Sequence, residues 1–324
     1  MAANSSTKKV VYAALLGNFL VATTKGGAAF WTGSSAMLSE TVHSFVDTLN
    51  ELLLLYGFHR AGRRPDLVHP LGYGREIYFW SFIVALMIFA LGSGVSIYQG
   101  IAHVRHPEPI QDPLVSYAVL ALSFLFEGGS WWVALKTFRA AKGEFGYYEA
   151  VRRSKDPPSF MVLFEDSAAL AGILIAAAGT FTAVRLQAPV LDGVASILIG
   201  LVLGGTAALL ARESKSLLIG EQADPRLTRL ILDIAAKEPT VSRANGLLTV
   251  QLAPDQIVAA LSLEFADDLR APEIEQAVTS IEQKVRALHP SVVTVFVKPQ
   301  TGARFREVRQ RRFGERKAPI SSRT

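Results

Sequence analysis

The chain of 324 residues contains no cysteine. Disulfide bonds, thiolate metal sites and cysteine nucleophiles are therefore excluded. Charged residues make up only 19% of the chain, whereas 50% of the residues are hydrophobic. This balance is too apolar for an ordinary soluble domain and too charged for a wholly embedded one. The composition therefore favours a membrane part joined to a soluble part.

Long apolar stretches fill the first two thirds of the sequence. A helix needs ~20 apolar residues to cross a bilayer, and six stretches qualify, at about residues 10–31, 36–58, 77–101, 114–137, 161–184 and 189–211. The first follows Lys8 and Lys9, as a signal peptide would, but it is too long and lacks a convincing cleavage pattern. We therefore expect a transmembrane domain of six helices over residues 1–212.

Basic residues are distributed unequally between the loops of this domain. Those after the second and fourth stretches hold Arg60, Arg63, Arg64, Arg75, Arg139, Lys142, Arg152, Arg153 and Lys155, whereas the opposite side holds Arg105 and Arg185. Because cytoplasmic loops are enriched in Lys and Arg, both termini are expected in the cytoplasm. The short N-terminal segment shows no evident transit peptide, which favours the cell inner membrane.

The composition changes after Arg212. Residues 225–237 have helical spacing, residues 247–252 and 257–265 alternate like strands, residues 273–288 form an amphipathic pattern, and residues 292–297 are β-branched. This α-β-β-α-β order predicts a small α+β domain over residues 213–300. Residues 301–324 are strongly basic, and we expect a disordered tail that lies against anionic lipid rather than nucleic acid.

The second apolar stretch contains two polar residues four positions apart, His43 and Asp47. A charged group near the bilayer centre costs from roughly 2.5 kcal/mol upward, so such residues face a bundle interior or a water path. An i,i+4 spacing places both on one helix face. At 100° per residue, Glu40, Asn50 and Glu51 share an arc of about 100° with them. The stripe predicts a lined pathway, the alternative being a structural histidine paired with one aspartate.

Two adjacent acids, Glu165 and Asp166, interrupt the fifth stretch. Imidazole with carboxylates suits Zn²⁺, for which about four donors are needed. His43, Asp47 and Asp166 supply three, and Glu165, Ser167 or water is the fourth. Metal binding requires deprotonated ligands, and imidazole titrates near neutral pH, so exchange of metal for protons is expected.

Three further charged residues belong to the predicted spans. Lys25 and Glu127 are interpreted as an intramembrane ion pair, because each otherwise lacks a partner. Asp192 follows Pro189 and is interpreted as an acid at the start of a helix.

The pattern His43-x-x-x-Asp47, with six spans and a C-terminal α+β domain, resembles the cation diffusion facilitator family. The stretches Gly33-Ser-Ser-Ala-Met37, His69-Pro-Leu-Gly-Tyr-Gly-Arg75 and His106-Pro-Glu-Pro-Ile110 carry the resemblance. Phe164-Glu-Asp-Ser-Ala-Ala-Leu-Ala-Gly172 and Leu217-Leu-Ile-Gly-Glu221 are similar to the zinc transporter nine subgroup. The resemblance implies a homodimer that exports divalent metal in exchange for protons by alternating access, with a ferredoxin-like cytoplasmic domain.

The sequence departs from the family pattern in three places. Val162 stands where the fifth span of the family has a histidine. Asp66 and His69 match a secondary zinc site of some members, but Tyr73 replaces its other histidine. The cytoplasmic domain has His289 alone and ends its last strand in Phe-Val-Lys-Pro. We therefore expect this domain to dimerise without a metal cluster.

These observations together predict a zinc/proton antiporter that exports the ion from the cytoplasm, with Zn²⁺ as substrate and no cofactor. The same scaffold carrying Mn²⁺, Fe²⁺ or Co²⁺, or acting as a membrane metal sensor without transport, is the alternative. A membrane-embedded metalloenzyme is disfavoured, because nothing resembles His-Glu-x-x-His.

Overall fold

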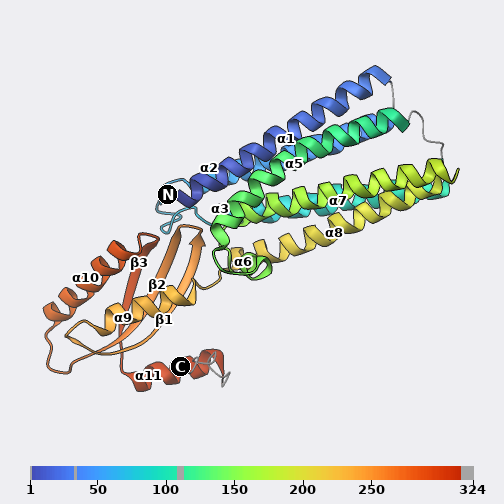
Figure 1. Cartoon of the computed structure of the whole chain (residues 1–324). Helices are drawn as coiled ribbons and strands as arrows, with labels where there is room; N and C mark the ends of the chain where they lie inside the picture. Colours follow the sequence, from blue (N-terminus) through green and yellow to red (C-terminus); the bar gives the residue numbers. More distant parts are fainter. Residues whose placement is uncertain (1, 33–34, 108–112, 315–324) are drawn as a thin grey trace. The chain divides into compact units, whose positions relative to one another are not determined.

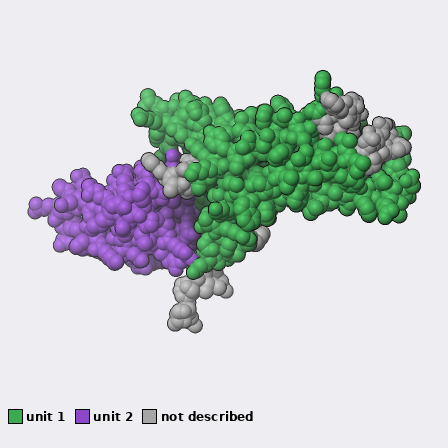
Figure 2. Space-filling view, turned by 45° about the horizontal axis from the view of Figure 1, so that its top comes forward, with its two compact units in different colours: residues 1–219 green, residues 220–324 purple. Residues whose placement is uncertain are grey.

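The computed structural model describes residues 2–32, 35–107 and 113–314, apart from the side chains of residues 2–5, 28, 29, 31, 32, 35–43, 113 and 148. The chain forms two compact units, residues 1–219 and 220–324 (Figure 2). Each unit has its own apolar core.

The first unit consists of helices. They are α1 (Ala2–Thr32), α2 (Ser35–Ala61), α3 (Glu76–Met87), η1 (Ile88–Gly94), α4 (Val95–Arg105), α5 (Pro113–Lys142), α6 (Tyr147–Arg153), α7 (Pro157–Arg185) and α8 (Val190–Ile219). The π-helical segment η1 joins α3 to α4 without a break.

Four helical segments of the described chain are long and apolar enough to cross a membrane: Glu76–Arg105, Leu114–Lys142, Pro157–Arg185 and Val190–Ile219. They correspond to the third to sixth predicted spans. Helices α1 and α2 occupy the positions of the first two, with 31 and 27 residues, and their crossing of the membrane stays a prediction. The unit is thus a membrane-type helical bundle.

The long helices run side by side along the bundle (Figure 1), and the contacts between them close a ring. Helix α1 contacts α2 and α5, α5 contacts α7, α7 contacts α8, α8 contacts α3 and α4, and α3 contacts α2. The ring is therefore not in sequence order, since α5 lies beside α1, and α8 beside α4.

Glycines allow α4 and α8 to approach closely. A Cβ atom on Gly100 would lie 2.7 Å from the carbonyl oxygen of Gly193 and 2.8 Å from the backbone nitrogen of Ile197. One on Gly193 would lie 2.9 Å from the Gly100 oxygen. These neighbours are backbone atoms, which cannot rotate away. Small residues at crossings are a common means of packing membrane helices.

We expect Gly100→Ala to lower the thermal unfolding midpoint of the purified chain, because overpacking a tight contact costs about 1–3 kcal/mol. Gly205→Ala, on α8, is the matched control, since its Cβ would meet nothing within 4 Å. Alanine favours a helix over glycine by up to ~1 kcal/mol, so Gly205→Ala should not lower the midpoint. The unfolding midpoints are measured by tryptophan fluorescence in detergent. Equal midpoints for the two variants would contradict the tight crossing of α4 and α8.

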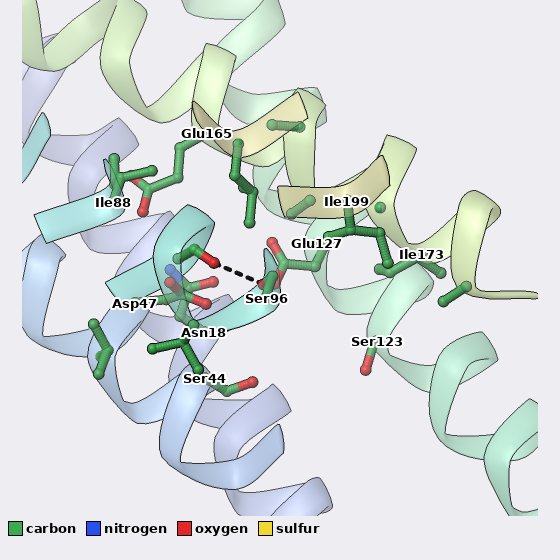
Figure 3. Close-up of a pocket in the computed structure, with 18 of the residues that line it drawn as sticks. Asn18, Ser44, Asp47, Ile88, Ser96, Ser123, Glu127, Glu165, Ile173 and Ile199 are labelled. Atoms are coloured by element: carbon green, nitrogen blue, oxygen red, sulfur yellow. Dashed lines mark hydrogen bonds between the residues drawn. The ribbon is translucent and has the colours of Figure 1, made fainter. Parts of the chain in front are cut away.

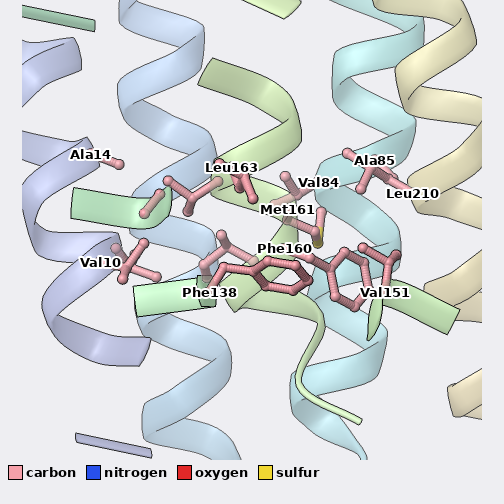
Figure 4. Close-up of a cluster of buried hydrophobic side chains, with 14 of the residues drawn as sticks. Val10, Ala14, Val84, Ala85, Phe138, Val151, Phe160, Met161, Leu163 and Leu210 are labelled. Carbon is pink, nitrogen blue, oxygen red and sulfur yellow. The ribbon is translucent and has the colours of Figure 1, made fainter. Parts of the chain in front are cut away.

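A large apolar cluster occupies one end of the bundle (Figure 4). It combines the start of α1, the end of α2, the start of α3, the end of α5, α6, the start of α7 and the end of α8. Its members include Val10, Leu54, Tyr78, Phe138, Val151, Phe160, Met161, Val162, Leu163 and Leu210, all of them buried. This end of the bundle is thus closed by side chains from most of the helices.

The second unit is a three-stranded sheet with helices. Its elements are α9 (Pro225–Ala236), β1 (Val241–Ala253), β2 (Gln256–Phe265), α10 (Ala271–Leu288), β3 (Val292–Pro299) and α11 (Gly302–Phe313). The strand order is β1-β2-β3, with β1 antiparallel and β3 parallel to β2. Alternate residues of β2, such as Leu261 and Leu263, pack with Ile231 of α9 and Ile281 of α10. The elements follow the predicted α-β-β-α-β order.

Helix α11 corrects the prediction of a disordered tail from residue 301. The ring of Phe305 covers Gly246 of β1, where an added Cβ would lie 2.3 Å from Phe305 Cζ. The backbone N–H of Gly302 donates to Glu264 Oε2 at 3.0 Å, and Glu307 forms ion pairs with Arg304 and Arg311. These contacts order residues 302–313, whereas 315–324 lie outside the described residues.

The division between the two units also differs from the predicted one at residue 212. Helix α8 continues to Ile219, and Leu217 is buried in the apolar cluster of the first unit. Residues 213–219 therefore belong to the end of a helix of the first unit rather than to the α+β domain.

Candidate functional site

A cavity of ≈ 490 Å³ lies within the helical unit (Figure 3). It is lined by residues of α1, α2, η1, α4, α5, α7 and α8. Four acids line it, Asp47, Glu127, Glu165 and Asp166, together with the cation Lys25. Serines and small apolar side chains make up much of the remaining wall. A polar cavity of this kind, inside a bundle with an apolar exterior, is typical of an ion pathway.

The two adjacent acids of α7 both face the cavity, although they lie 100° apart around the helix. Glu165 Oε1 accepts a hydrogen bond from Asn50 Nδ2 of α2 at 3.1 Å. Asp166 Oδ2 accepts one from Ser130 Oγ of α5 at 2.7 Å. One acid is therefore held by a side chain of α2 and the other by a side chain of α5.

The other candidate ligands are placed as follows. Asp47 lines the cavity from α2. His43 belongs to the same helix, one turn earlier, but its side chain lies outside the described residues. Ser167 accepts a hydrogen bond from Trp131 Nε1 and donates one to the carbonyl oxygen of Leu163, and it does not line the cavity. Ser167 is thus placed less favourably for binding an ion than Glu165.

Among the described side chains, no three carboxylates or histidines lie close enough together to hold one metal ion. The acids share a cavity wall without forming a compact cluster. The described carboxylates of the cavity therefore do not by themselves form a compact metal site.

The helical unit matches the family model of the cation efflux transmembrane domain over residues 11–219. The chain belongs to the cation efflux family. The predicted resemblance to cation diffusion facilitators of the zinc transporter nine subgroup is confirmed by this match and by the similar proteins.

Relatives of the chain include animal, plant and bacterial proteins. The mitochondrial proton-coupled zinc antiporter SLC30A9 of Xenopus laevis is 33% identical over 260 residues, which cover 79% of the chain and 46% of that protein. Metal tolerance protein C4 of Arabidopsis thaliana is 36% identical over 80% of the chain and 57% of its own length. The cation-efflux pump FieF of Cronobacter sakazakii is 26% identical over 89% and 92%. The chain thus spans about half the length of the first two relatives.

Two acids that were not predicted as ligands, Glu127 and Glu51, are buried in the helical unit. Glu127 was interpreted as the partner of Lys25, but it lines the cavity with the other acids and interacts electrostatically with Asp47 as well as Lys25. Lys25 Nζ also donates to Ser44 Oγ at 3.0 Å. Glu51, on the predicted polar stripe, is fully buried. The sequence feature that could have identified Glu127 and Glu51 is the same in both cases: an acidic residue within an apolar stretch.

The loop between α2 and α3 holds the residues of the predicted secondary zinc site. Asp66 Oδ1 accepts from the backbone N–H groups of Val68 and His69, and Tyr73 Oη–H donates to Asp66 Oδ2. The Tyr73 hydrogen bond, with that of His69, lowers the pKa of Asp66. In this arrangement Asp66 shapes the loop, and a metal ion would have to compete with these donors. The zinc site at Asp66 and His69 stays a prediction.

Proposed function

We propose that the chain is a proton-coupled antiporter that exports a divalent metal ion, Zn²⁺ in preference to others, from the cytoplasm. The observation that carries the proposal is the cavity inside a membrane-type bundle, whose wall includes Asp47, Glu127, Glu165 and Asp166. The name of the animal relatives, proton-coupled zinc antiporter, supports the choice of ion and of coupling. The residue chemistry suggests transport rather than an enzymatic reaction.

The proposed ligands of the transported ion are His43, Asp47, Asp166 and Glu165. Together they would give one imidazole and three carboxylates, a set that fits the four-coordinate geometry of Zn²⁺. Val162, at the position of the family histidine, is buried in the apolar cluster one turn from Asp166. We propose that Glu165 of α7, which accepts a hydrogen bond from Asn50 of α2, serves as a ligand in place of the family histidine.

Proton coupling follows from the charge balance of the cavity. Several carboxylates enclosed at low dielectric are costly when ionised without a cation nearby. Departure of the metal ion would therefore be accompanied by proton uptake, and metal binding by proton release. Lys25 would offset part of the charge in both states.

Alternating access is supported by the unequal ends of the bundle. The apolar cluster closes the end that contains α6 and the start of α7. The cavity lining instead extends toward the opposite end of the bundle. It includes Leu120 near the start of α5, Ala176 in the second half of α7 and Ser196 near the start of α8. With six spans and both termini cytoplasmic, as the basic loops predict, the structure would represent a state closed toward the cytoplasm. The proposed location is the cell inner membrane.

The second unit is proposed to form a homodimer. On the face of the sheet opposite to its core, register places Leu248, Ala260 and Phe296 side by side. Leu248 and Phe296 are 45% and 57% exposed. An apolar row across a sheet is a surface that a second copy of the chain would cover.

A second candidate substrate is Mn²⁺, Fe²⁺ or Co²⁺ on the same scaffold. The specific observation in its favour is the acid-rich lining, in which carboxylates outnumber the single predicted imidazole. Carboxylate-rich sites suit Mn²⁺ better than sites rich in imidazole do.

The test is metal flux in proteoliposomes that contain only the purified chain. Zn²⁺ should accumulate inside vesicles when the interior is acidic, and the accumulation should stop when an ionophore collapses the pH gradient. Competition by excess Mn²⁺, Fe²⁺ or Co²⁺ separates the two candidate cargos. Vesicles that take up no metal above protein-free controls, with any of these ions, would refute transport and favour the sensor alternative.

A further inference from the structure

Glu51 of α2 is a buried acid whose carboxylate oxygens accept no hydrogen bond from the described residues. It lies one turn after Asp47, its exposure is 0%, and neither carboxylate oxygen has a hydrogen-bond partner among the described residues. It interacts electrostatically with Glu165, Asp166 and other acids, and these interactions are repulsive when both groups are ionised. A buried carboxylate of this kind costs several kcal/mol unless a cation or a proton accompanies it.

The side chains next to Glu51 carry further unused oxygen atoms. Asn50, also 0% exposed, donates through Nδ2 to Glu165 Oε1. Its own Oδ1 is buried and has no donor among the described residues, and the same holds for Glu165 Oε2. Two carboxylates and one amide thus present acceptors with no donor, although buried polar atoms are normally satisfied.

Asn50 and Glu51 lie outside the cavity wall, toward the apolar cluster. Glu165 lines the cavity, whereas Asn50 and Glu51 are not part of its wall. Leu54, one turn further along α2, and Met161, one turn before Glu165 in α7, both belong to the apolar cluster. Asn50 and Glu51 therefore lie between the cavity and the closed end.

We propose that Glu51, Asn50 and Glu165 form a second divalent-cation site with oxygen ligands, on the route between the cavity and the closed end of the bundle. Carboxylate and amide oxygens are hard donors that favour Mn²⁺, Mg²⁺ or Ca²⁺ over Zn²⁺. Glu165 faces both sites, so an ion leaving one would meet a ligand of the other. The inference rests on the proposed function and adds an inner binding step to it.

The test counts Mn²⁺ ions bound by the full chain in lipid nanodiscs, by equilibrium dialysis and atomic absorption. The wild-type chain should bind two ions and Glu51→Gln one, because the amide keeps the shape and removes the charge. Asp47→Asn, which removes a carboxylate of the cavity, should also leave one. Glu275→Gln, at an exposed position of α10, is the control and should keep two.

The unfolding midpoint distinguishes a lost site from a lost fold. A bound ion stabilises the folded state, so added Mn²⁺ should raise the midpoint of the wild-type chain more than that of Glu51→Gln. If Glu51→Gln does not fold, Glu51→Asp takes its place. This variant keeps the charge, and one of its two ions should bind at least about 10-fold more weakly.

One ion bound by the wild-type chain and by Glu51→Gln alike would overturn the second site. So would two ions bound by both. Transport of metal by a chain that binds a single ion would leave the proposed function standing. Two bound ions without any flux would refute transport and leave the second site in place.

Discussion

Asp166→Asn should reduce the initial rate of Zn²⁺ uptake into proteoliposomes by at least about 100-fold. Removal of a hydrogen-bonding partner behind a metal ligand already costs 10–100-fold, and loss of the ligand itself should cost no less. Asp166 is 1% exposed and lines the cavity. Asparagine has nearly the same shape and can still accept from Ser130 Oγ, so the effect should arise from the lost charge rather than from misfolding.

Two further variants serve as a control and as an intermediate case for the effect of Asp166→Asn on the uptake rate. Asp192→Asn makes the same chemical change in the helical unit, at an acid that accepts from Thr180 Oγ1 at 3.5 Å and does not line the cavity. It should leave the rate within about twofold. Ser130→Ala removes the donor that orients Asp166 and should fall between the two, near 10-fold. If Asp166→Asn transports at the rate of Asp192→Asn, Asp166 is not a ligand of the transported ion.

The sequence predicted the elements of the protein, but not the order in which the helices pack around the bundle. Apolar length and polar stripes located the helices, because each depends on residues within one segment. The same holds for the α-β-β-α-β order of the second unit. The position of α5 beside α1, however, depends on contacts between distant segments, such as that of Gly17 with the backbone of Phe126. No periodicity in either segment encodes it.

The site was predicted in the same uneven way. Asp47, Glu165 and Asp166 stood out as acids in apolar stretches, and all three line the cavity. Glu127 stood out equally, but its role depends on which helix α5 faces, and the ion pair with Lys25 was the simpler interpretation. Helix α11 was missed because its order depends on Phe305 meeting Gly246 of a strand far away in the sequence. A local pattern of basic residues carries no information about that contact.

The closed end of the bundle should be the part most sensitive to truncation. Phe160 of α7 is 1% exposed and packs in the apolar cluster with Val10 of α1 and Leu210 of α8. Phe160→Ala should lower the free energy of unfolding by about 3–5 kcal/mol, because a large buried ring is replaced by a cavity. Phe181→Ala, on the same helix, is the matched control: Phe181 is 54% exposed, and its truncation should cost much less.

The same pair of variants tests the cluster as a barrier to ions. If it closes one end of the pathway, Phe160→Ala should let Zn²⁺ leak from loaded vesicles without a pH gradient, whereas Phe181→Ala should hold the ion as the wild-type chain does. Leak is measured at a temperature well below the unfolding midpoint of each variant, so that unfolded protein does not contribute. A destabilised Phe160→Ala that still retains Zn²⁺ would mean that the cluster stabilises the bundle without sealing it. The barrier would then lie nearer the acids, where Asn50 joins α2 to Glu165 of α7.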